Sequence, residues 1–429
     1  MCTPTPAIAD FKVAIIGAGL SGLTLALASH RNSIPCTIYE ASDTPERVHG
    51  GSLTLSPNGL AAIEPLGVNS CLQAFGRSYQ AVMIHNNTGK VINKLLLGDK
   101  QVFGYDGMRI IRGVLIRELA TAGRERGVEI LCNKKFIGVT SESKTEGVAF
   151  QFADGSRGHA NLLVGADGIH SRVRSNVFPD AVEPTYIGQT VVYASCARDR
   201  ITSDTAVPLG MYIGDAGAVM LGPHVPDDAD YVVGLQKQYP DLGRKGWDEL
   251  SKDRKMLRAF MEEGKNRWPV HVQSAMENAR DESLGLWAMH VLPKLDSWVS
   301  SGGRAVLLAD AAHAMPPTGG QGANMAFEDS DTLGAVLGWI VKLDGKSLDE
   351  SLDFWQKMRR KRIELVLEMA MQWNKMRKPA VEREKMQKGE AFEGAATEDA
   401  RIEQMRWLFD GVAAQRRQVE AWAAGNCFD

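Results

Sequence analysis

The feature that most constrains the fold of this chain is a glycine-rich turn near its start. Residues 17–22 read GAGLSG, a GxGxxG pattern between the apolar run FKVAII at 11–16 and an Ala- and Leu-rich segment at 20–30. A continuous apolar run is typical of a parallel strand that is covered on both faces. The first glycine permits a tight turn, the second lets a pyrophosphate approach the backbone, and the third allows helix and strand to pack closely. The pattern therefore predicts a βαβ unit that binds a dinucleotide.

An acidic residue at the end of the next strand strengthens this prediction. Residues 36–40 read CTIYE and predict the second strand, and Glu40 lies 18 residues after Gly22. A carboxylate at that position accepts hydrogen bonds from ribose hydroxyls, and the helix N-terminus offers free N–H groups and positive potential to phosphate. We predict that the following residues contact the nucleotide: Gly17, Gly19, Leu20, Ser21, Gly22 and Glu40.

Composition excludes several function classes. The net charge is −3 and both signs are interspersed, so no basic surface for nucleic acid is expected. No apolar run approaches ~18 residues, which argues against a transmembrane segment, and no basic segment precedes the first strand, which argues against a signal peptide. The six cysteines are scattered and the histidines form no HxH or HExxH pattern, so we predict no metal site and a reducing, cytoplasmic location.

The chain alternates between two kinds of segment. Strand-like runs at 162–165 and 305–309 each lead into a turn that contains Asp, whereas strands between 183 and 286 are broken by Gly, Pro and Asp. Beyond residue 345, helical spacing predicts one helix that ends before Pro379 and one more at 401–424. We predict an α/β protein with a Rossmann-type domain formed by residues 1–76, 103–182 and 287–344. A mostly antiparallel β-sheet substrate domain, residues 77–102 and 183–286, is inserted into it. C-terminal helices at 345–429 follow as a helical brace.

Two further stretches carry a resemblance to a known family. Residues 165–174 read GADGIHSRVR and residues 309–324 read ADAAHAMPPTGGQGAN. They resemble the two other signatures of the group A flavin monooxygenases, the para-hydroxybenzoate hydroxylase-like enzymes, in the family's order. Residues 46–55 (ERVHGGSLTL) resemble the salicylate hydroxylase and tetracycline-inactivating branches. One departure is Ala309, where the family usually has Gly; we expect its methyl group to shift the strand end slightly.

The resemblance implies that the dinucleotide is FAD. Asp310 would accept hydrogen bonds from the ribityl hydroxyls, and the glycines after Pro317 would let the backbone approach a flat ring. The helix that begins near Ala323 would direct its positive end at the flavin pyrimidine. The cofactor contacts that we predict beyond the first loop are Arg47, Arg112, Asp167, Asp310, Pro317, Gly320, Gly322, Ala323 and Asn324. For His313 we expect a structural hydrogen bond rather than catalysis.

The function implied by the resemblance is that of an FAD-dependent monooxygenase. NADPH or NADH would reduce the flavin, O2 would add at its C4a carbon, and one oxygen atom would pass to a small, mostly apolar or aromatic substrate. Only one strand-associated GxGxxG is present, and the resemblance implies that NAD(P)H docks transiently. A reductase or halogenase of the same superfamily and a catalytically silent flavin-binding protein stay open as alternatives. A monomer or homodimer is expected.

The strands at 190–194, 211–214 and 219–221 are the predicted source of the substrate site. Their large alternating side chains would face the flavin and form the mostly apolar lining that small ligands require. The predicted contacts are an apolar wall of Tyr193, Met211 and Met220, polar groups from Tyr212 or His224, and Pro316 in the loop at 316–322, the flavin loop. A period of two does not say which face each residue occupies, so a role in the core of the sheet stays open for each of them.

Overall fold

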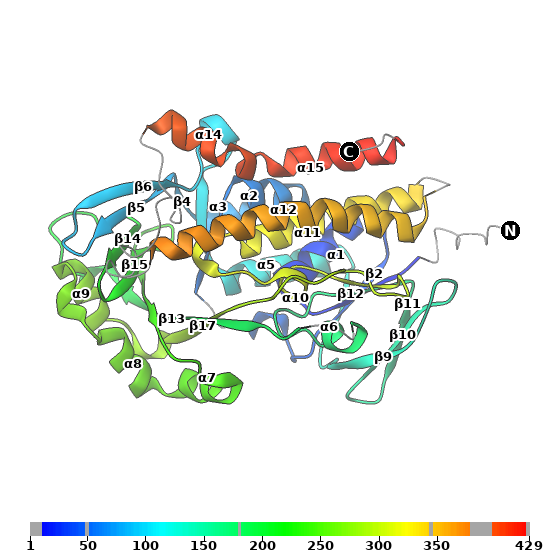
Figure 1. Ribbon diagram of the computed structural model, residues 1–429, viewed down its shortest axis with the longest axis horizontal. Helices are drawn as coiled ribbons and strands as arrows, with labels where there is room; N and C mark the ends of the chain where they lie inside the picture. Colours follow the sequence, from blue (N-terminus) through cyan, green and yellow to red (C-terminus); the bar gives the residue numbers. More distant parts are fainter. Residues whose placement is uncertain (1–10, 48–50, 179–181, 343–345, 378–396, 426–429) are drawn as a thin grey trace.

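The computed structural model describes residues 11–47, 51–178, 182–342, 346–377 and 397–425. The molecule is elongated, with a large sheet at one end and a smaller parallel sheet toward the other (Figure 1). Two long helices, α11 (Gly322–Lys342) and α12 (Leu348–Met376), lie side by side along it. Within the described residues, no helix is both long enough and apolar enough to cross a membrane.

The parallel sheet confirms the predicted Rossmann-type core. Its strands, in spatial order, are β18 (Ala305–Leu307), β12 (Leu162–Gly165), β1 (Val13–Ile16), β2 (Cys36–Tyr39) and β8 (Glu129–Leu131). All four residues of β1 are buried, as expected for a strand covered on both faces. Helices α1 (Leu20–Arg31), α5 (Arg112–Glu125) and α11 pack together over the sheet.

A small antiparallel sheet packs against the parallel one. Its strands are β11 (Arg157–Ala160), β10 (Gly147–Phe152) and β9 (Phe136–Ser143). Phe150 and Phe152 project from β10 onto Tyr39 of β2, with ring centroids 5.6 and 4.9 Å from the tyrosine ring. Aromatic packing thus closes this side of the core.

Two further sheets make up the other half of the molecule. A three-stranded sheet has the order β3 (Ser52–Leu55), β7 (Gly107–Ile111), β4 (Arg77–Tyr79). The largest has the order β17 (Gly285–Val291), β13 (Thr185–Ala197), β16 (Asp230–Gln238), β15 (Gly217–Pro223), β14 (Gly210–Gly214), β5 (Ala81–Asn86), β6 (Val91–Leu96). Only the β14–β5 pair in it is parallel, so the sheet is mostly antiparallel. The domain boundaries themselves stay predictions.

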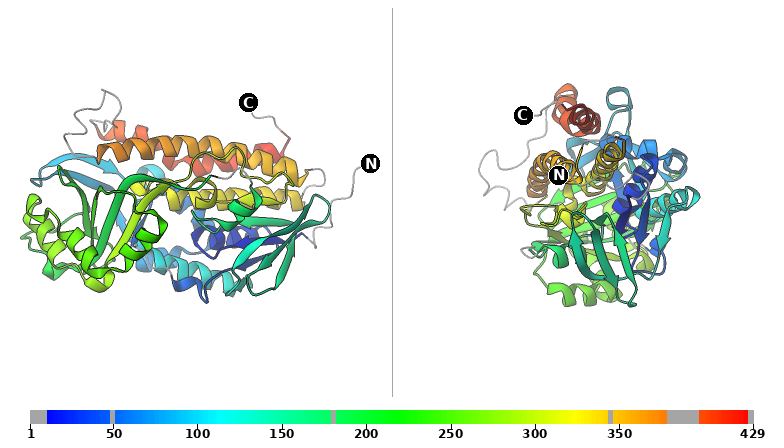
Figure 2. Two further views of the ribbon diagram at one scale, coloured as in Figure 1. Left: turned by 60° about the horizontal axis from the view of Figure 1, so that its bottom comes forward. Right: turned by 90° about the vertical axis from the view of Figure 1, so that its right-hand side faces the viewer.

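Three helices interrupt the segment from 183 to 286, where the sequence predicts only strands. They are α7 (Gly243–Lys252), α8 (Arg254–Glu262) and α9 (Val270–Glu277), and they lie together beside the seven-stranded sheet (Figure 2). Leu257, Phe260 and Met276 from α8 and α9 share one buried cluster with strand residues such as Leu235. One face of the sheet is therefore covered by helices, which leaves the other face for a site.

The single helix predicted at 401–424 is wrong, because the structure has two. Helix α14 (Glu398–Phe409) ends at Asp410 and α15 begins at Gly411 (Gly411–Ala423). Arg362 of α12 causes the break: its guanidinium donates hydrogen bonds to the carbonyls of Trp407 and Leu408, and a Cβ at Gly411 would lie 2.1 Å from it. The remaining helices are α2 (Pro57–Ile63), α3 (Asn69–Phe75), α4 (Lys100–Phe103), α6 (Arg172–Val177) and α10 (Asp310–His313).

Candidate functional site

The glycines of the first loop differ in what surrounds them. Gly17 has φ +105°, and an added Cβ would lie 2.6 Å from the carbonyl oxygen of Ala166. At Gly22 a Cβ would lie 2.0 Å from the carbonyl oxygen of Gly17, whereas at Gly19 nothing lies within 4 Å. Gly17 and Gly22 are thus required by the turn and by close packing. Gly19 leaves open space beside the backbone where a ligand can approach.

Glu40 closes the first loop. Its Oε2 accepts a hydrogen bond from Ala18 N at 2.8 Å, and its Oε1 accepts one from Ser42 N at 2.9 Å. Helix α1 starts after Gly19 with no side-chain cap, so its first N–H groups stay available to an anion. The side chains of Leu20 and Ser21 are buried, which leaves their backbones as the groups that face a ligand.

Asp167 lies directly against this loop but is already fully engaged. Its carboxylate accepts hydrogen bonds from Ser171 Oγ (2.5 Å) and from the backbone N–H groups of Arg172 and Val173. Burial raises the pKa of this carboxyl above its usual range, against the effect of those bonds. An added Cβ at Gly17 would lie 3.1 Å from Asp167 Cα. Asp167 therefore holds the start of α6 beside the loop, and a direct contact with the cofactor stays a prediction.

The second loop begins with a strained residue. Ala309 has φ +55° and ψ −133°, a conformation that costs a residue other than glycine about 1–3 kcal/mol. Backbone strain is thus located just after β18, and the expected shift of the strand end stays a prediction. Asp310 follows with an exposed side chain at the start of α10. Its carboxylate is available to a ligand.

A buried ionic cluster holds the strained turn in place. The Ala309 N–H donates to Asp329 Oδ2 (3.1 Å), and His313 Nε2 donates to the same oxygen (2.6 Å). Arg359 of α12 donates to Asp329 Oδ1 (2.6 Å) and to Glu328 (2.7 Å). His313 thus has the structural hydrogen bond that the sequence predicts. Support for the turn comes from α11 and α12.

Asn324 has a different role from the predicted cofactor contact. Its side chain is 0% exposed; it donates to the carbonyls of Thr54 and Gly320 and accepts from Ser56 N. It therefore fastens the start of α11 to the segment after β3, and its amide is not free for a ligand. This is a correction of the prediction, because an amide that pairs with three backbone groups is satisfied.

The segment after β3 contains buried polar residues that no sequence motif indicates. Asn58 is 0% exposed and donates to Gln321 and Glu328, while Gln321 donates to Ser56. Residues 56–58 read SPN directly after the strand. That polar turn was the available signal, but its partners are more than 260 residues away.

The flavin loop between these anchors presents backbone rather than side chains. Pro316 is buried and leads into a short turn, η7 (Pro317–Gly319), after which Gly320 adopts φ +62°. A Cβ at Gly320 would be 3.8 Å from Thr54 Cβ, and one at Gly322 would meet nothing within 4 Å. Ala323 lies in the first turn of α11. The loop thus leaves room beside β3 for a flat ring.

The two predicted arginines lie on neighbouring elements. Arg47 ends a short turn, η2 (Pro45–Arg47), and its side chain lies outside the described residues. Arg112 begins α5, and its N–H donates to the Gly51 carbonyl at 3.2 Å. A Cβ at Gly51 would be 3.7 Å from the Tyr193 ring. Burial raises the pKa of Tyr193 although the Arg112 charge opposes it. Arg112 and Tyr193 are therefore neighbours.

The register of the large sheet sorts the predicted substrate residues into two faces. Met211 pairs with Met220, Met220 with Gly234, and Gly234 with Tyr193, and directly paired residues project to the same face. This face lies opposite the one covered by α8 and α9. Met220 and Tyr193 are half-buried and Met211 is buried. The predicted wall residues thus share the face opposite α8 and α9.

Tyr212 is not on that face, which corrects the prediction. It lies 1% exposed in the cluster under the helices, and its hydroxyl hydrogen-bonds to His271 at 2.8 Å. The neighbours Met211 and Tyr212 project to opposite faces because strand side chains alternate. His224, the other polar candidate, reaches Ser52 Oγ through Nδ1 (2.8 Å) and Asp230 through Nε2 (3.0 Å). Burial lowers its pKa, although Asp230 opposes this.

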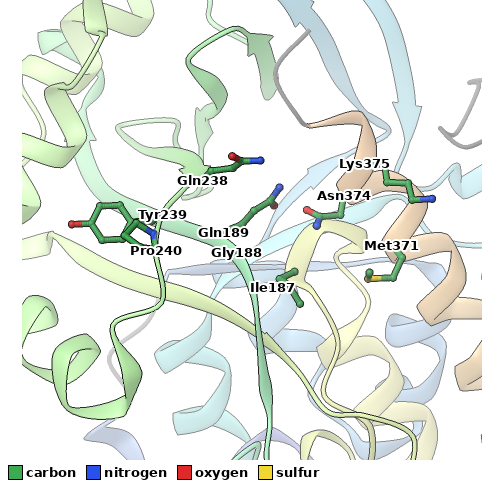
Figure 3. Close-up of a pocket in the computed structure, with 9 residues that line it drawn as sticks. All are labelled: Ile187, Gly188, Gln189, Gln238, Tyr239, Pro240, Met371, Asn374 and Lys375. Carbon is green, nitrogen blue, oxygen red and sulfur yellow. The ribbon is translucent and has the colours of Figure 1, made fainter. Parts of the chain in front are cut away.

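A cavity of about 640 Å³ opens between the large sheet and the end of α12 (Figure 3). Its lining is formed by Ile187, Gly188, Gln189, Gln238, Tyr239, Pro240, Met371, Asn374 and Lys375. Gln236 donates to both Gln189 and Asn374, and Arg377 donates to the Thr318 carbonyl in the flavin loop (2.8 Å). The cavity contains none of the predicted wall residues, but this amide cluster connects it to the loop.

Comparison with known proteins decides the family. The profile of the family described as "FAD binding domain" matches residues 10–370. The chain belongs to this family. A 3-amino-4-hydroxybenzoate 2-monooxygenase of Streptomyces platensis is 30% identical over 76% of the chain and 79% of that protein. A 6-hydroxynicotinate 3-monooxygenase of Bordetella bronchiseptica is 30% identical over 76% and 82%. The protein is an FAD-dependent monooxygenase.

Solved structures share the fold of this FAD-dependent monooxygenase. The Klebsiella pneumoniae HpxO complex with FAD and uric acid has a TM-score of 0.74 at 23% identity and covers 94% of this chain and 96% of its own. A salicylate hydroxylase substrate complex has a TM-score of 0.71 at 21% identity, with 96% and 98% covered. The groups in the chain also fit FAD: open space at Gly19, the uncapped α1, exposed Asp310, and the open backbone at Gly320 and Gly322.

Proposed function

We propose that this monooxygenase hydroxylates a small aromatic compound held between the flavin loop and the face of the large sheet opposite α8 and α9. The observation that carries the proposal is that β3 lies between both sides: Gly51, just before it, faces the Tyr193 ring, and Thr54 within it faces Gly320. Met220 contacts Arg109, the strand partner of Thr54. The relatives named above act, by their names, on an aminohydroxybenzoate and a hydroxynicotinate, which supports a substituted aromatic ring as the substrate.

The chain has three tasks in this proposal. The α1 N-terminus and Gly19 bind the pyrophosphate, Glu40 the ribose, and Asp310 the ribityl chain. The half-buried Tyr193 and Met220 hold the substrate ring and keep water away from it. When bound, FAD supplies the redox chemistry: it takes electrons from NAD(P)H and activates O2 for transfer of one oxygen atom.

The proposed FAD contacts are tested by Asp310→Ala. Because the variant loses a charge-assisted acceptor, we expect FAD affinity to fall by a factor of roughly 10 to 100. FAD retained after dilution and gel filtration is the readout. Asp154→Ala is the matched control, since Asp154 is exposed on the β9–β11 side and pairs with Lys134. Equal FAD retention in both variants would remove Asp310 from the site.

The proposed substrate position is tested by Tyr193→Ala and Met220→Ala. We expect both variants to keep FAD and to consume NAD(P)H without forming an equal amount of hydroxylated product. Product per NAD(P)H, measured by mass spectrometry, is the readout. Tyr239→Ala, in the lining of the 640 Å³ cavity, is the comparison. Loss of coupling only in Tyr239→Ala would move the substrate to that cavity.

A further inference from the structure

A buried arginine in β7 has no partner of opposite charge among the described residues. Arg109, in the middle of β7, is 3% exposed. Its Nη1 donates to the thioether sulfur of Met220 at 3.2 Å, and its Nε is buried without a hydrogen-bond partner. A thioether is a weak acceptor. The Arg109 guanidinium is therefore a charged group that is shielded from solvent and has no strong acceptor.

The nearby carboxylates already have other partners. Asp228 accepts two hydrogen bonds from Arg77, at 2.6 and 3.0 Å. Asp230 pairs with His224 (3.0 Å) and Arg280 (2.7 Å). Burial lowers the pKa of Arg109 to about 10, in the direction expected for a guanidinium that no described anion neutralises. A buried charge without a partner destabilises the folded protein. We therefore expect the charge of Arg109 to have a function.

The position of Arg109 indicates what the charge is for. Thr54 and Arg109 are directly paired and therefore share one face of the three-stranded sheet, and Thr54 lies beside Gly320 in the flavin loop. Across the gap, Met220 covers the guanidinium from the large sheet and is itself half-buried. The side chain of Met220 thus separates the Arg109 guanidinium from the space in which we place the substrate ring.

We infer that Arg109 binds a carboxylate of the substrate, so that this enzyme acts on an aromatic acid. The inference rests on the proposed function. Methionine is flexible and adapts its packing, so the Met220 thioether can move from Nη1 and admit a carboxylate that pairs with two N–H groups of the guanidinium. The flavin phosphates are not this anion, because they are expected at α1, on the parallel sheet.

The test compares acids with their neutral amides on the oxidised, FAD-loaded protein. The probes are 4-hydroxybenzoate and salicylate against 4-hydroxybenzamide and salicylamide, titrated by calorimetry and by the change in flavin absorbance. We expect each acid to bind at least about tenfold more tightly than its amide. Arg109→Met should abolish this preference and leave amide affinity unchanged. Arg109→Lys should keep part of it, since the charge remains but the paired geometry does not.

Two control variants and a stability measurement separate this role from a structural one. Arg77→Met removes a neighbouring arginine on the same sheet face and should keep the preference; Arg377→Met removes the cation at the flavin loop and should keep it as well. Arg109→Met should melt at the same or a higher temperature without FAD, because methionine replaces an unpaired buried charge. A structural arginine predicts a lower melting temperature.

Several outcomes would overturn the inference. They are a preference for acids that survives in Arg109→Met, one that is lost in Arg377→Met instead, a lower melting temperature of Arg109→Met, or no preference for acids in the unaltered protein. Failure of the proposed function would look different. In that case the unaltered protein would contain no FAD, or would bind these aromatic probes without any change in the flavin spectrum.

Discussion

The two loops that we assign to FAD are built in opposite ways. The loop at residues 17–22 is held mainly by its own βαβ unit: Gly22 packs on Gly17, and Glu40 hydrogen-bonds to Ala18. The loop at residues 309–324 is held from α12 and α15, by Arg359 and Gln415. The residues that hold the loop at 17–22 therefore lie within or near its own motif. The residues that hold the loop at 309–324 lie in helices much later in the chain.

Arg359→Met should show the largest effect, because it breaks the remote support. Arg359 is 0% exposed and pairs with both Glu328 and Asp329; removal of one partner from such a cluster costs about 3–5 kcal/mol. We expect the free energy of unfolding in urea to fall by that amount. Lys357→Met is the control, since Lys357 lies on the same helix in an exposed pair with Asp353, worth about 0–1 kcal/mol. Similar losses in both variants would contradict the distinction.

Acid should weaken the second loop through Glu328. Burial alone would raise the pKa of this carboxyl, but the charges of Arg362 and Arg359 lower it from 4.5 to about 2. A carboxyl with a depressed pKa in the folded state contributes stability that is present above pH 4.5 and is lost as the pH falls toward 2. Melting temperatures across this range should fall steeply in the unaltered protein and less steeply in Glu328→Gln. Parallel curves would argue against the role of the cluster.

Two glycine variants sharpen the comparison within the first loop. Gly22→Ala places a Cβ 2.0 Å from a backbone oxygen, whereas Gly19→Ala meets nothing within 4 Å. Without FAD, Gly22→Ala should therefore melt at a lower temperature and Gly19→Ala should be almost unchanged. Both should bind FAD more weakly, because the Gly19 methyl group occupies the approach of the pyrophosphate. A stable Gly19→Ala protein with full FAD affinity would show that the ligand lies elsewhere.

The smallest effect is expected for Ala309→Gly, and its sign is the informative part. Glycine adopts φ +55° without the strain of a Cβ, and this gain is partly offset by the entropy of the unfolded chain. We expect a stabilisation of about 1 kcal/mol or less, seen as a slightly higher melting temperature. Ala312→Gly, in α10, should instead be destabilising. A lower melting temperature for Ala309→Gly would mean that the turn needs the methyl group.

The parts of the fold that the sequence predicts well are those with local causes. β12 has the predicted bounds and α1 begins at the predicted residue, because the glycine turn and the apolar run act within a few residues of each other. Glu40 was identifiable for the same reason. Its partner, Ala18, belongs to the neighbouring motif.

The predictions that the structure corrects depend on residues far away in the sequence. Tyr212 was placed on the wrong face because alternation alone does not identify the face that α8 and α9 cover. The break between α14 and α15 depends on Arg362, and the role of Asn324 depends on Thr54 and Ser56. In each of these cases the deciding partner lies at least 40 residues away, where neither periodicity nor a motif can indicate it.

The link from Gln415 to Glu328 has a consequence for how the protein is made. Gln415 Nε2 donates to Glu328 at 2.7 Å, so the buried cluster is incomplete until the ribosome has translated and released α15. Glu328 and Arg359 must wait while most of the chain is already outside the exit tunnel. During that interval the loop at residues 309–324 still lacks part of its support.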